Sequence, residues 1–228
     1  MKRRLDDLHL TLAGLVLLLV WDLAGLDLAV MRALGDGQGF AWRDRWLTAG
    51  LLHGGGRALG WLLMGLLVVN AVRPLWAGPS RAERWRWLAV TAACLLLVPA
   101  LKQVSRTSCP WDLAEFGGWA AYVSHWQLGV ADGGPGRCFP SGHATAAFAF
   151  VSGWFALREH QPRAARAWLA GALLLGLAFG IGQTLRGAHY PSHSLWTAWL
   201  CWTCSAALLP RRRRPLPLPQ PQLHPTDG

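Results

Sequence analysis

The residues best suited to chemistry lie in the segment Pro140-Ser-Gly-His143, where polar residues give way to the apolar run Ala144–Leu157. Pro140 suits the first position of a helix, because its φ is preset and its missing N–H would have had no partner. The unpaired N–H groups of a first turn, with the positive end of the helix dipole, bind phosphate. Gly142 lets an anion approach the backbone, Ser141 adds a hydroxyl, and His143 can donate a proton near neutral pH. The segment predicts a phosphate-binding helix N-terminus, although an ordinary polar cap on a membrane helix would use the same residues.

A second polar segment runs from Arg186 to His193. Pro191 suits a helix start, so His189 is expected just before a second helix N-terminus. His189 can attack phosphorus directly to give a phosphohistidine, and His143 can protonate the leaving alkoxide. His193 is four residues after His189, so both can lie on one helix face and His193 can hold the neutral tautomer of His189. The three histidines therefore predict phosphoryl transfer.

Cations that can bind a phosphoryl group accompany the histidines. Lys102 and Arg106 lie in a third polar cluster, which ends at Asp112. Fixed positive charges and backbone donors stabilise the charge that develops on phosphoryl oxygens. The expected phosphate-binding set is Lys102, Arg106, Ser141, Gly142 and Arg186.

The composition is that of a membrane protein. Hydrophobic residues make up 53% of the 228 residues and charged ones only 15%, and they gather in runs that with their flanks approach the roughly 20 residues of a membrane-spanning helix. The runs lie near Leu8–Val20, Ala58–Val72, Trp87–Leu101, Ala144–Leu157, Ala167–Leu185 and Leu195–Leu209. We predict an all-α, polytopic membrane protein with six transmembrane helices in one domain, residues 1–209, followed by a basic, Pro-rich cytoplasmic tail at 210–228 that is disordered or extended.

The net charge of +10 is distributed in a way that argues against nucleic-acid binding. Most Lys and Arg residues flank alternate connections of a six-helix arrangement, which is the positive-inside pattern. This pattern places both termini in the cytoplasm and the three polar clusters on the outer face. We therefore expect a multi-pass protein of a bacterial cytoplasmic membrane, with its active site on the periplasmic or outer side.

The longest connection, residues 105–137, lies on the outer side and is too long for a plain turn, so it is expected to be an active-site loop. Cys109 and Cys138 are on this side, where an oxidising compartment would allow a disulfide between them. The remaining cysteines lie in apolar runs and are expected to be inert. The sequence shows no internal repeat and no strand pattern.

Two carboxylates, Asp22 and Asp27, lie in the outer third of a first helix that is expected at about Leu8–Val30. Intramembrane carboxylates are often functional, but near the interface they can equally well reach water. The second helix opens with His53-Gly-Gly-Gly-Arg57, which places an imidazole and a guanidinium on the outer side.

These segments resemble the type 2 phosphatidic acid phosphatase superfamily, membrane phosphatases related to vanadium haloperoxidases. The family's second motif, Pro-Ser-Gly-His, matches in full at Pro140–His143, and the third matches at His189 and the Tyr-Pro-Ser that follows. The resemblance implies that His143 is the general acid and His189 the nucleophile. It covers residues 102–193 by motif and the other residues only by topology.

The chain departs from the family pattern at three positions. Cys109 stands at the arginine of the first motif, and Arg106 is a candidate to supply its charge. Gln183 stands at the arginine of the third motif, and Arg186 is the corresponding candidate. His193 stands at the aspartate that would orient the nucleophile, and either His193 or Asp112 can take that role. The Cys-Pro-Trp-Asp-Leu stretch resembles a bacterial branch of the family with similar substitutions.

The leading interpretation is a membrane phosphatase that hydrolyses a lipid phosphate monoester or diphosphate through a phosphohistidine, without a cofactor or metal. Its substrates would be phosphatidate-like phospholipids, polyprenyl phosphates or a phosphorylated glycolipid. A lipid-to-lipid phosphotransferase on the same site is a near alternative. Two interpretations from different classes also remain open: a non-catalytic membrane protein, and a metal-binding one in which His189, His193, Cys109 and Cys138 would be ligands.

Overall fold

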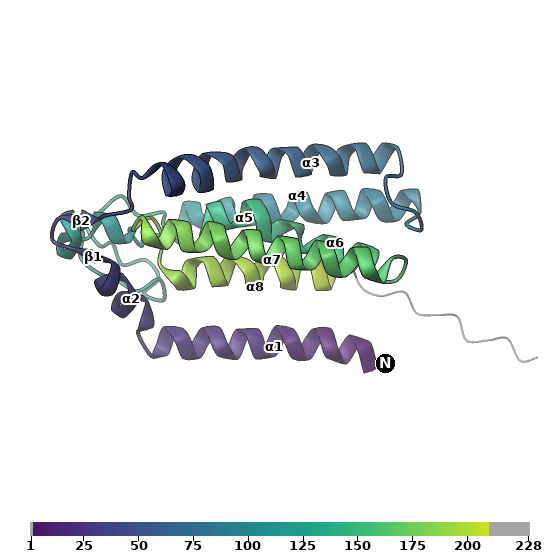
Figure 1. The fold of residues 1–228 in the computed structure, drawn as a ribbon. Helices are drawn as coiled ribbons and strands as arrows, with labels where there is room; N and C mark the ends of the chain where they lie inside the picture. The colour runs from purple at the N-terminus through teal and green to yellow at the C-terminus, as the bar shows by residue number, and fades with distance from the viewer. Residues whose placement is uncertain (1, 210–228) are drawn as a thin grey trace, which may run out of the picture.

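The computed structural model describes residues 2–209, which form a bundle of helices aligned along one axis (Figure 1). The predicted tail at 210–228 lies outside the described residues. The helices are α1 (Lys2–Leu23), α2 (Leu26–Leu34), α3 (Gly56–Val72), α4 (Arg81–Val104), α5 (Gly142–Phe148), α6 (Ser152–Leu157), α7 (Pro162–Leu185) and α8 (Pro191–Leu208). The shorter elements are strands β1 (Gly35–Asp36) and β2 (Gly39–Phe40), the π-helix η1 (Trp46–Gly55), and the 3-10 helices η2 (Pro110–Asp112), η3 (Ala114–Phe116) and η4 (Ala149–Val151). The predicted all-α class is confirmed.

The first predicted helix is broken, which corrects the single span expected at Leu8–Val30. α1 and α2 meet at an angle of 65°, and Gly25 between them has a φ of 65°. This left-handed conformation is accessible to glycine because it has no β-carbon. The apolar character of the sequence continues through the break, so hydropathy alone does not reveal it. The bend directs α2 across the end of the bundle that carries the connection between α7 and α8, where α2 meets α8 (Figure 1).

Three helical segments of residues 2–209 are long and apolar enough to cross a membrane: Trp46–Val72, Arg81–Val104 and Pro162–Leu185. The bent pair α1–α2 makes a fourth if it is counted as one span. The other two of the six predicted helices are the continuous rod α5–η4–α6 and α8, which lie beside these helices in the bundle (Figure 1). The rod is shorter than a bilayer core requires, and α8 begins with polar residues.

The rod α5–η4–α6 lies in the middle of the bundle and contributes much of its core. Phe148, Phe150 and Leu157 are buried there with Trp87 of α4. The Trp87 indole donates to Ser152 Oγ at 3.2 Å, which satisfies a polar group in this apolar setting. Large apolar side chains on the outside of the bundle, among them Leu17, Trp61, Leu96 and Leu174, remain exposed. Such an exterior suits contact with lipid rather than with water.

The polar connections gather at one end of the bundle. β1 and β2 form a two-residue antiparallel pair there, which is too short to show an alternating pattern in the sequence. Phe40 of β2, Phe116 of η3 and Tyr190 are buried together in a second, smaller core. This core fixes the long loop at residues 105–137, called the outer loop below, against the connection between α7 and α8, which carries His189.

Candidate active site

The segment Pro140–His143 begins its helix slightly later than predicted. α5 starts at Gly142, with Ser141 at the N-cap and Pro140 before it. The Ser141 N–H donates to the carbonyl of His193 at 3.1 Å, so α5 and α8 are joined at their starts. The Ser141 hydroxyl is buried without a hydrogen-bond partner. A buried hydroxyl without a partner is costly, so it is a candidate to bind a ligand oxygen.

The structure brings the three predicted histidines together from α5, the α7–α8 connection and α8. The ring centroids of His143 and His189 are 6.2 Å apart, and those of His189 and His193 are 5.9 Å apart. His189 is only 2% exposed. Its burial, reinforced by the positive charge of Lys102, holds the pKa of His189 well below its usual value. The imidazole is therefore neutral at physiological pH, as a nucleophile must be.

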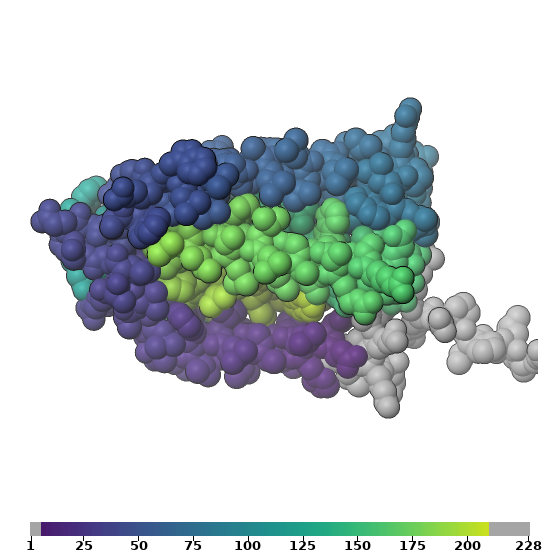
Figure 2. All heavy atoms as spheres, in the orientation of Figure 1, coloured from purple at the N-terminus to yellow at the C-terminus, as the bar shows by residue number. Residues whose placement is uncertain are grey.

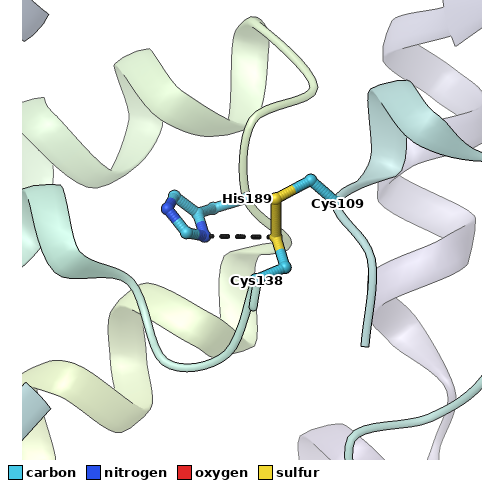
Figure 3. Close-up of side chains that lie close together, drawn as sticks. All are labelled: Cys109, Cys138 and His189. Atoms are coloured by element: carbon cyan, nitrogen blue, oxygen red, sulfur yellow. Dashed lines mark hydrogen bonds between the residues drawn. A yellow bond between two sulfur atoms is a disulfide. The ribbon is translucent and has the colours of Figure 1, made fainter. Parts of the chain in front are cut away.

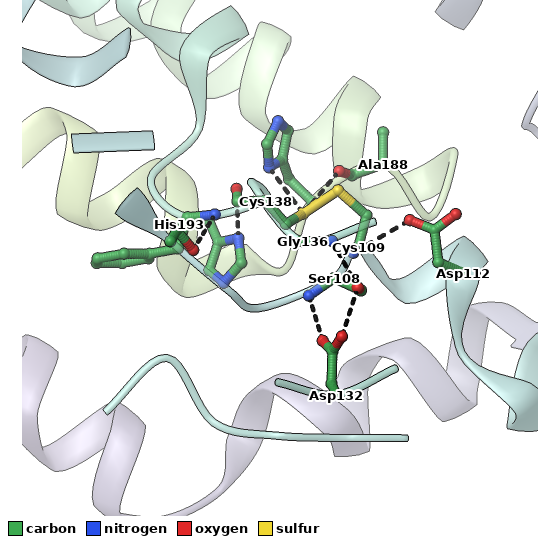
Figure 4. Close-up of a disulfide and its surroundings, with 11 residues drawn as sticks. Ser108, Cys109, Asp112, Asp132, Gly136, Cys138, Ala188 and His193 are labelled. Carbon is green, nitrogen blue, oxygen red and sulfur yellow. Dashed lines mark hydrogen bonds between the residues drawn. A yellow bond between two sulfur atoms is a disulfide. The ribbon is translucent and has the colours of Figure 1, made fainter. Parts of the chain in front are cut away.

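The expected disulfide is present between Cys109 and Cys138, whose Cα atoms are 5.1 Å apart. Figure 3 shows His189 beside it, with Nδ1 3.5 Å from Cys138 Sγ. The backbone carbonyl of Cys138 accepts a hydrogen bond from Nδ1 of His193 at 3.0 Å (Figure 4). A carbonyl can only accept, so the proton of neutral His193 is on Nδ1. Cys138 therefore contacts both histidines.

Neither residue predicted to orient His189 makes a hydrogen bond to it among residues 2–209. His193 bonds to the Cys138 carbonyl instead. Asp112 Oδ2 accepts from the Cys109 N–H at 3.3 Å (Figure 4), and burial raises the pKa of this carboxyl. Asp112 thus caps the turn η2, on the far side of the disulfide from the imidazole. The residue that faces Nδ1 of His189 is Cys138.

The predicted cations divide into two groups. Lys102 lies over the start of α5, where its Cδ is 4.0 Å from the place that a β-carbon on Gly142 would take. Lys102 and Arg186 both lie close enough to His143 to interact with it electrostatically. Arg106 is exposed and is not among the charges that act on His143 or His189. The structure therefore supports Lys102 and Arg186 as site residues and does not place Arg106 there.

Sequence reasoning noticed Asp27 but did not assign it a partner. Its carboxylate accepts a hydrogen bond of 2.9 Å from the Ser192 N–H and another from the Ser192 hydroxyl. The indole of Trp21 also donates to it at 2.9 Å. Because Ser192 lies in the first turn of α8, Asp27 caps this helix from α2. The carboxylate thereby fixes the chain directly after His189.

Replacing Asp27 with asparagine is expected to lower the free energy of unfolding by about 1–3 kcal/mol, because the amide has one acceptor oxygen for the three donors that Ser192 and Trp21 direct at the carboxylate. The measurement is denaturant unfolding of the purified protein in detergent. Asp36→Asn is the matched control, since Asp36 is exposed and its carboxylate accepts from the Gln38 N–H in its own turn. Equal losses in the two variants would contradict the capping role of Asp27.

A second anchor of the outer loop escaped sequence analysis. Both carboxylate oxygens of Asp132 bind Ser108, one the N–H at 2.5 Å and the other the hydroxyl at 2.8 Å (Figure 4). The Ser108 hydroxyl also accepts from the Gly136 N–H at 3.0 Å. These bonds join the two ends of the loop beside the disulfide. No signal marks Asp132, because its partner is 24 residues away in the chain.

The family model of the PAP2 superfamily matches residues 84–214. This is more than half of the chain. The chain belongs to the PAP2 superfamily. The match includes α4, the outer loop, the rod α5–η4–α6, α7 and α8, and so all the residues placed in the site above except those of the first two helices.

Among solved structures, the fold of this PAP2 protein is similar to that of the first transmembrane PAP2-type phosphatidylglycerolphosphate phosphatase from Bacillus subtilis. The two chains are 20% identical, with a TM-score of 0.55 over 91% of this chain and 94% of the other. At this identity the similarity concerns the fold. No curated protein matches the chain.

In this PAP2 protein the structure also shows the contacts of Cys109 and Gln183, the two residues that stand where the family motifs have arginine. Cys109 forms the disulfide. Gln183 lies beside Arg186, with Oε1 3.4 Å from Nη1 of the guanidinium. The side chain at the motif position therefore holds an arginine located three residues later.

Proposed function

We propose that the protein is a lipid phosphatase that uses His189 as its nucleophile and His143 as its general acid. The observation that carries this proposal is the placement of a buried, neutral His189 beside His143, near the cation Lys102. A neutral imidazole can attack a phosphoryl group. Burial and the neighbouring cations lower the pKa of His143 to about 3 in the absence of a ligand, so its role as general acid requires that the bound phosphoryl dianion raises this pKa and that His143 takes up a proton. Membership of the PAP2 superfamily supports the same reaction class.

In the first step, the Nε2 lone pair of His189 attacks phosphorus, because Nδ1 faces Cys138 Sγ. A P–N bond forms, the P–O bond to the lipid breaks, and the leaving oxygen takes a proton from His143. In the second step, a water molecule gives its proton to His143 as its oxygen attacks phosphorus. The P–N bond then breaks and phosphate leaves with the histidine restored. Lys102 and Arg186 neutralise charge on the phosphoryl oxygens in both steps.

A lipid substrate is supported by an apolar groove on the outside of the bundle. It has a volume of about 600 Å³ and is lined from α1, α7 and α8, with Trp21 and Leu195 among its residues. Figure 2 shows the hollow between α1 and α7, with α8 behind it. A second hollow of about 300 Å³ shares these two residues and extends to Leu185 and Pro191, on either side of the connection that carries His189. A lipid tail in the groove would have its phosphate near the site.

The metal-binding alternative loses two of its ligands. Cys109 and Cys138 are joined in the disulfide, and zinc is bound by free thiolates. Release of inorganic phosphate by the purified protein tests the phosphatase directly. The panel contains phosphatidate, phosphatidylglycerol phosphate, a polyprenyl diphosphate and a phosphorylated glycolipid, each with and without a strong chelator. Chelator-resistant release from at least one lipid is expected, and no release from any lipid would contradict the proposal.

The site is proposed to lie on the outer face of a bacterial cytoplasmic membrane, with both termini in the cytoplasm. This rests on the distribution of Lys and Arg residues. The start of α1 and the α6–α7 connection lie at one end of the bundle, and the polar connections at the other (Figure 1).

Labelling of intact cells with a membrane-impermeant maleimide tests this orientation. A cysteine introduced at Leu128, which is 88% exposed in the outer loop, should react, whereas one at Arg163 should react only after the membrane is opened. The opposite pattern would place the site on the cytoplasmic side.

A further inference from the structure

His53 belongs to none of the motifs above, yet its ring packs against that of His143. The two ring centroids are 3.9 Å apart, with an angle of 37° between the planes. His53 lies in the π-helix η1, which continues directly into α3. The contact therefore joins this helical segment to the proposed general acid. The Nδ1 atom of His53 is 3.0 Å from Nη1 of Arg186. A guanidinium can only donate, so this nitrogen of His53 accepts and the ring hydrogen is on Nε2.

Among residues 2–209, Arg186 has three hydrogen-bond partners. Besides His53, its Nε donates to the carbonyl of Arg43 at 2.8 Å, and its Nη1 lies 3.4 Å from Oε1 of Gln183. Its Nη2 atom makes no hydrogen bond to any of residues 2–209. Arg186 is also in electrostatic contact with His143. It therefore presents a fixed positive charge near the proposed general acid and retains a guanidinium nitrogen that can donate to a ligand.

Buried polar atoms without partners surround this group. They are the Ser141 hydroxyl, Nδ1 of His143 and Nε2 of Gln183. The start of α5 supplies two of these atoms and α7 the third. An oxyanion can accept from a hydroxyl, an amide N–H and an imidazole N–H at once, which would satisfy all three. Lys102, Arg57 and Arg186 supply the positive charge around the His143 ring.

We propose that His53 is a positioning residue of the phosphate site: it holds Arg186 in the place of the substituted motif arginine and supports the ring of His143. This rests on the proposed function for its catalytic consequence. Without the Nδ1 acceptor, Arg186 loses one of its three partners and moves relative to the phosphoryl oxygens. Without the ring, His143 loses the surface against which it is packed. The two contributions belong to different parts of one side chain and can be separated.

Two substitutions separate them. His53→Phe keeps a ring against His143 but removes the acceptor for Arg186. His53→Asn removes the ring but retains a carbonyl oxygen close to the former Nδ1 position. His160→Phe is the control for a histidine-to-phenylalanine change, since His160 pairs with Glu83 at the opposite end of the bundle. Each protein is assayed for binding of inorganic phosphate by calorimetry, for turnover of the best lipid of the panel, and for thermal stability.

The His53→Phe variant is expected to bind phosphate about ten- to a hundredfold more weakly and to show a matching rise in KM, because a hydrogen bond to a charged group is lost. Its kcat should change less. His53→Asn is expected to bind phosphate within about threefold of the original protein, because the acceptor is retained, and to lose mainly kcat. A loss of stability alone would affect all parameters of both variants together.

The outcomes separate the two proposals. If the original protein binds phosphate but releases none from lipids, the phosphatase proposal fails, and the phosphate affinities of the variants still decide the role of His53. If His53→Phe binds phosphate as tightly as the original protein, His53 does not position Arg186 and the inference is overturned. If the original protein binds no phosphate at all, the inference is overturned as well.

Discussion

Replacing His189 with alanine is expected to reduce kcat by at least about a thousandfold, because the attacking nitrogen is removed and water must displace the lipid directly. The rest of the phosphate site should survive, since Lys102 and Arg186 are held by α4 and by His53 and Arg43. KM for the lipid should therefore change by less than about tenfold. His160→Ala is the matched control. A His189→Ala variant with more than about a tenth of the original kcat would show that another group attacks.

The pH dependence of the original protein bears on the same residue. A free histidine has a pKa of about 6.5, but burial and the charge of Lys102 hold the pKa of His189 well below its usual value. The imidazole thus stays neutral, and able to attack, as the pH falls through 6.5. Activity that depends on neutral His189 should persist below this pH and decline only at lower pH. An acid limb in kcat/KM centred on the ordinary histidine pKa would argue against a buried nucleophile.

Reduction of the Cys109–Cys138 disulfide is expected to destabilise the protein and to abolish most of its activity. The bond closes a loop with a sequence separation of 29, for which loop entropy gives about 3–4 kcal/mol. It also fixes Cys138, whose sulfur faces His189 and whose carbonyl binds His193. The measurements are denaturant unfolding and phosphate release with and without a phosphine reductant.

The Cys109→Ser/Cys138→Ser double variant provides the control for the reductant. It should resemble the reduced protein, and the reductant should have no further effect on it, because the remaining cysteines Cys94, Cys201 and Cys204 are already free. Full activity of the reduced protein at a temperature where it remains folded would show that Cys138 does not position His189.

The parts of the candidate site that the sequence could place are those that follow from local pattern. The Pro-Ser-Gly-His segment and the Arg186–His193 segment each precede a helix, and their proximity follows once the helices are placed in one bundle. The disulfide was predictable because Cys109 and Cys138 are the cysteines outside the apolar runs. These features need only the order of helices and the compartment in which each connection lies.

The features that the sequence did not reveal depend on tertiary contacts between distant segments. Asp27 reaches Ser192 only because the chain changes direction by 65° between α1 and α2. Hydropathy does not distinguish a bent helix from a straight one. Asp112 was a reasonable candidate for the missing carboxylate, but it caps its own turn. The contact of His53 with His143 and Arg186 joins three elements, and no spacing within one segment could reveal it.

The central claim is that the phosphoryl group passes through His189, and trapping the intermediate tests it most directly. The protein is mixed with the best lipid substrate, denatured in base within one turnover, digested, and analysed by mass spectrometry for a phosphorylated histidine. We predict phosphate on the peptide that contains His189, its absence in His189→Ala, and accumulation in His143→Ala when the lipid carries a good leaving group, because His143 activates the water of the second step. Full turnover with no phosphorylated His189, or phosphate on a different residue, would contradict the account.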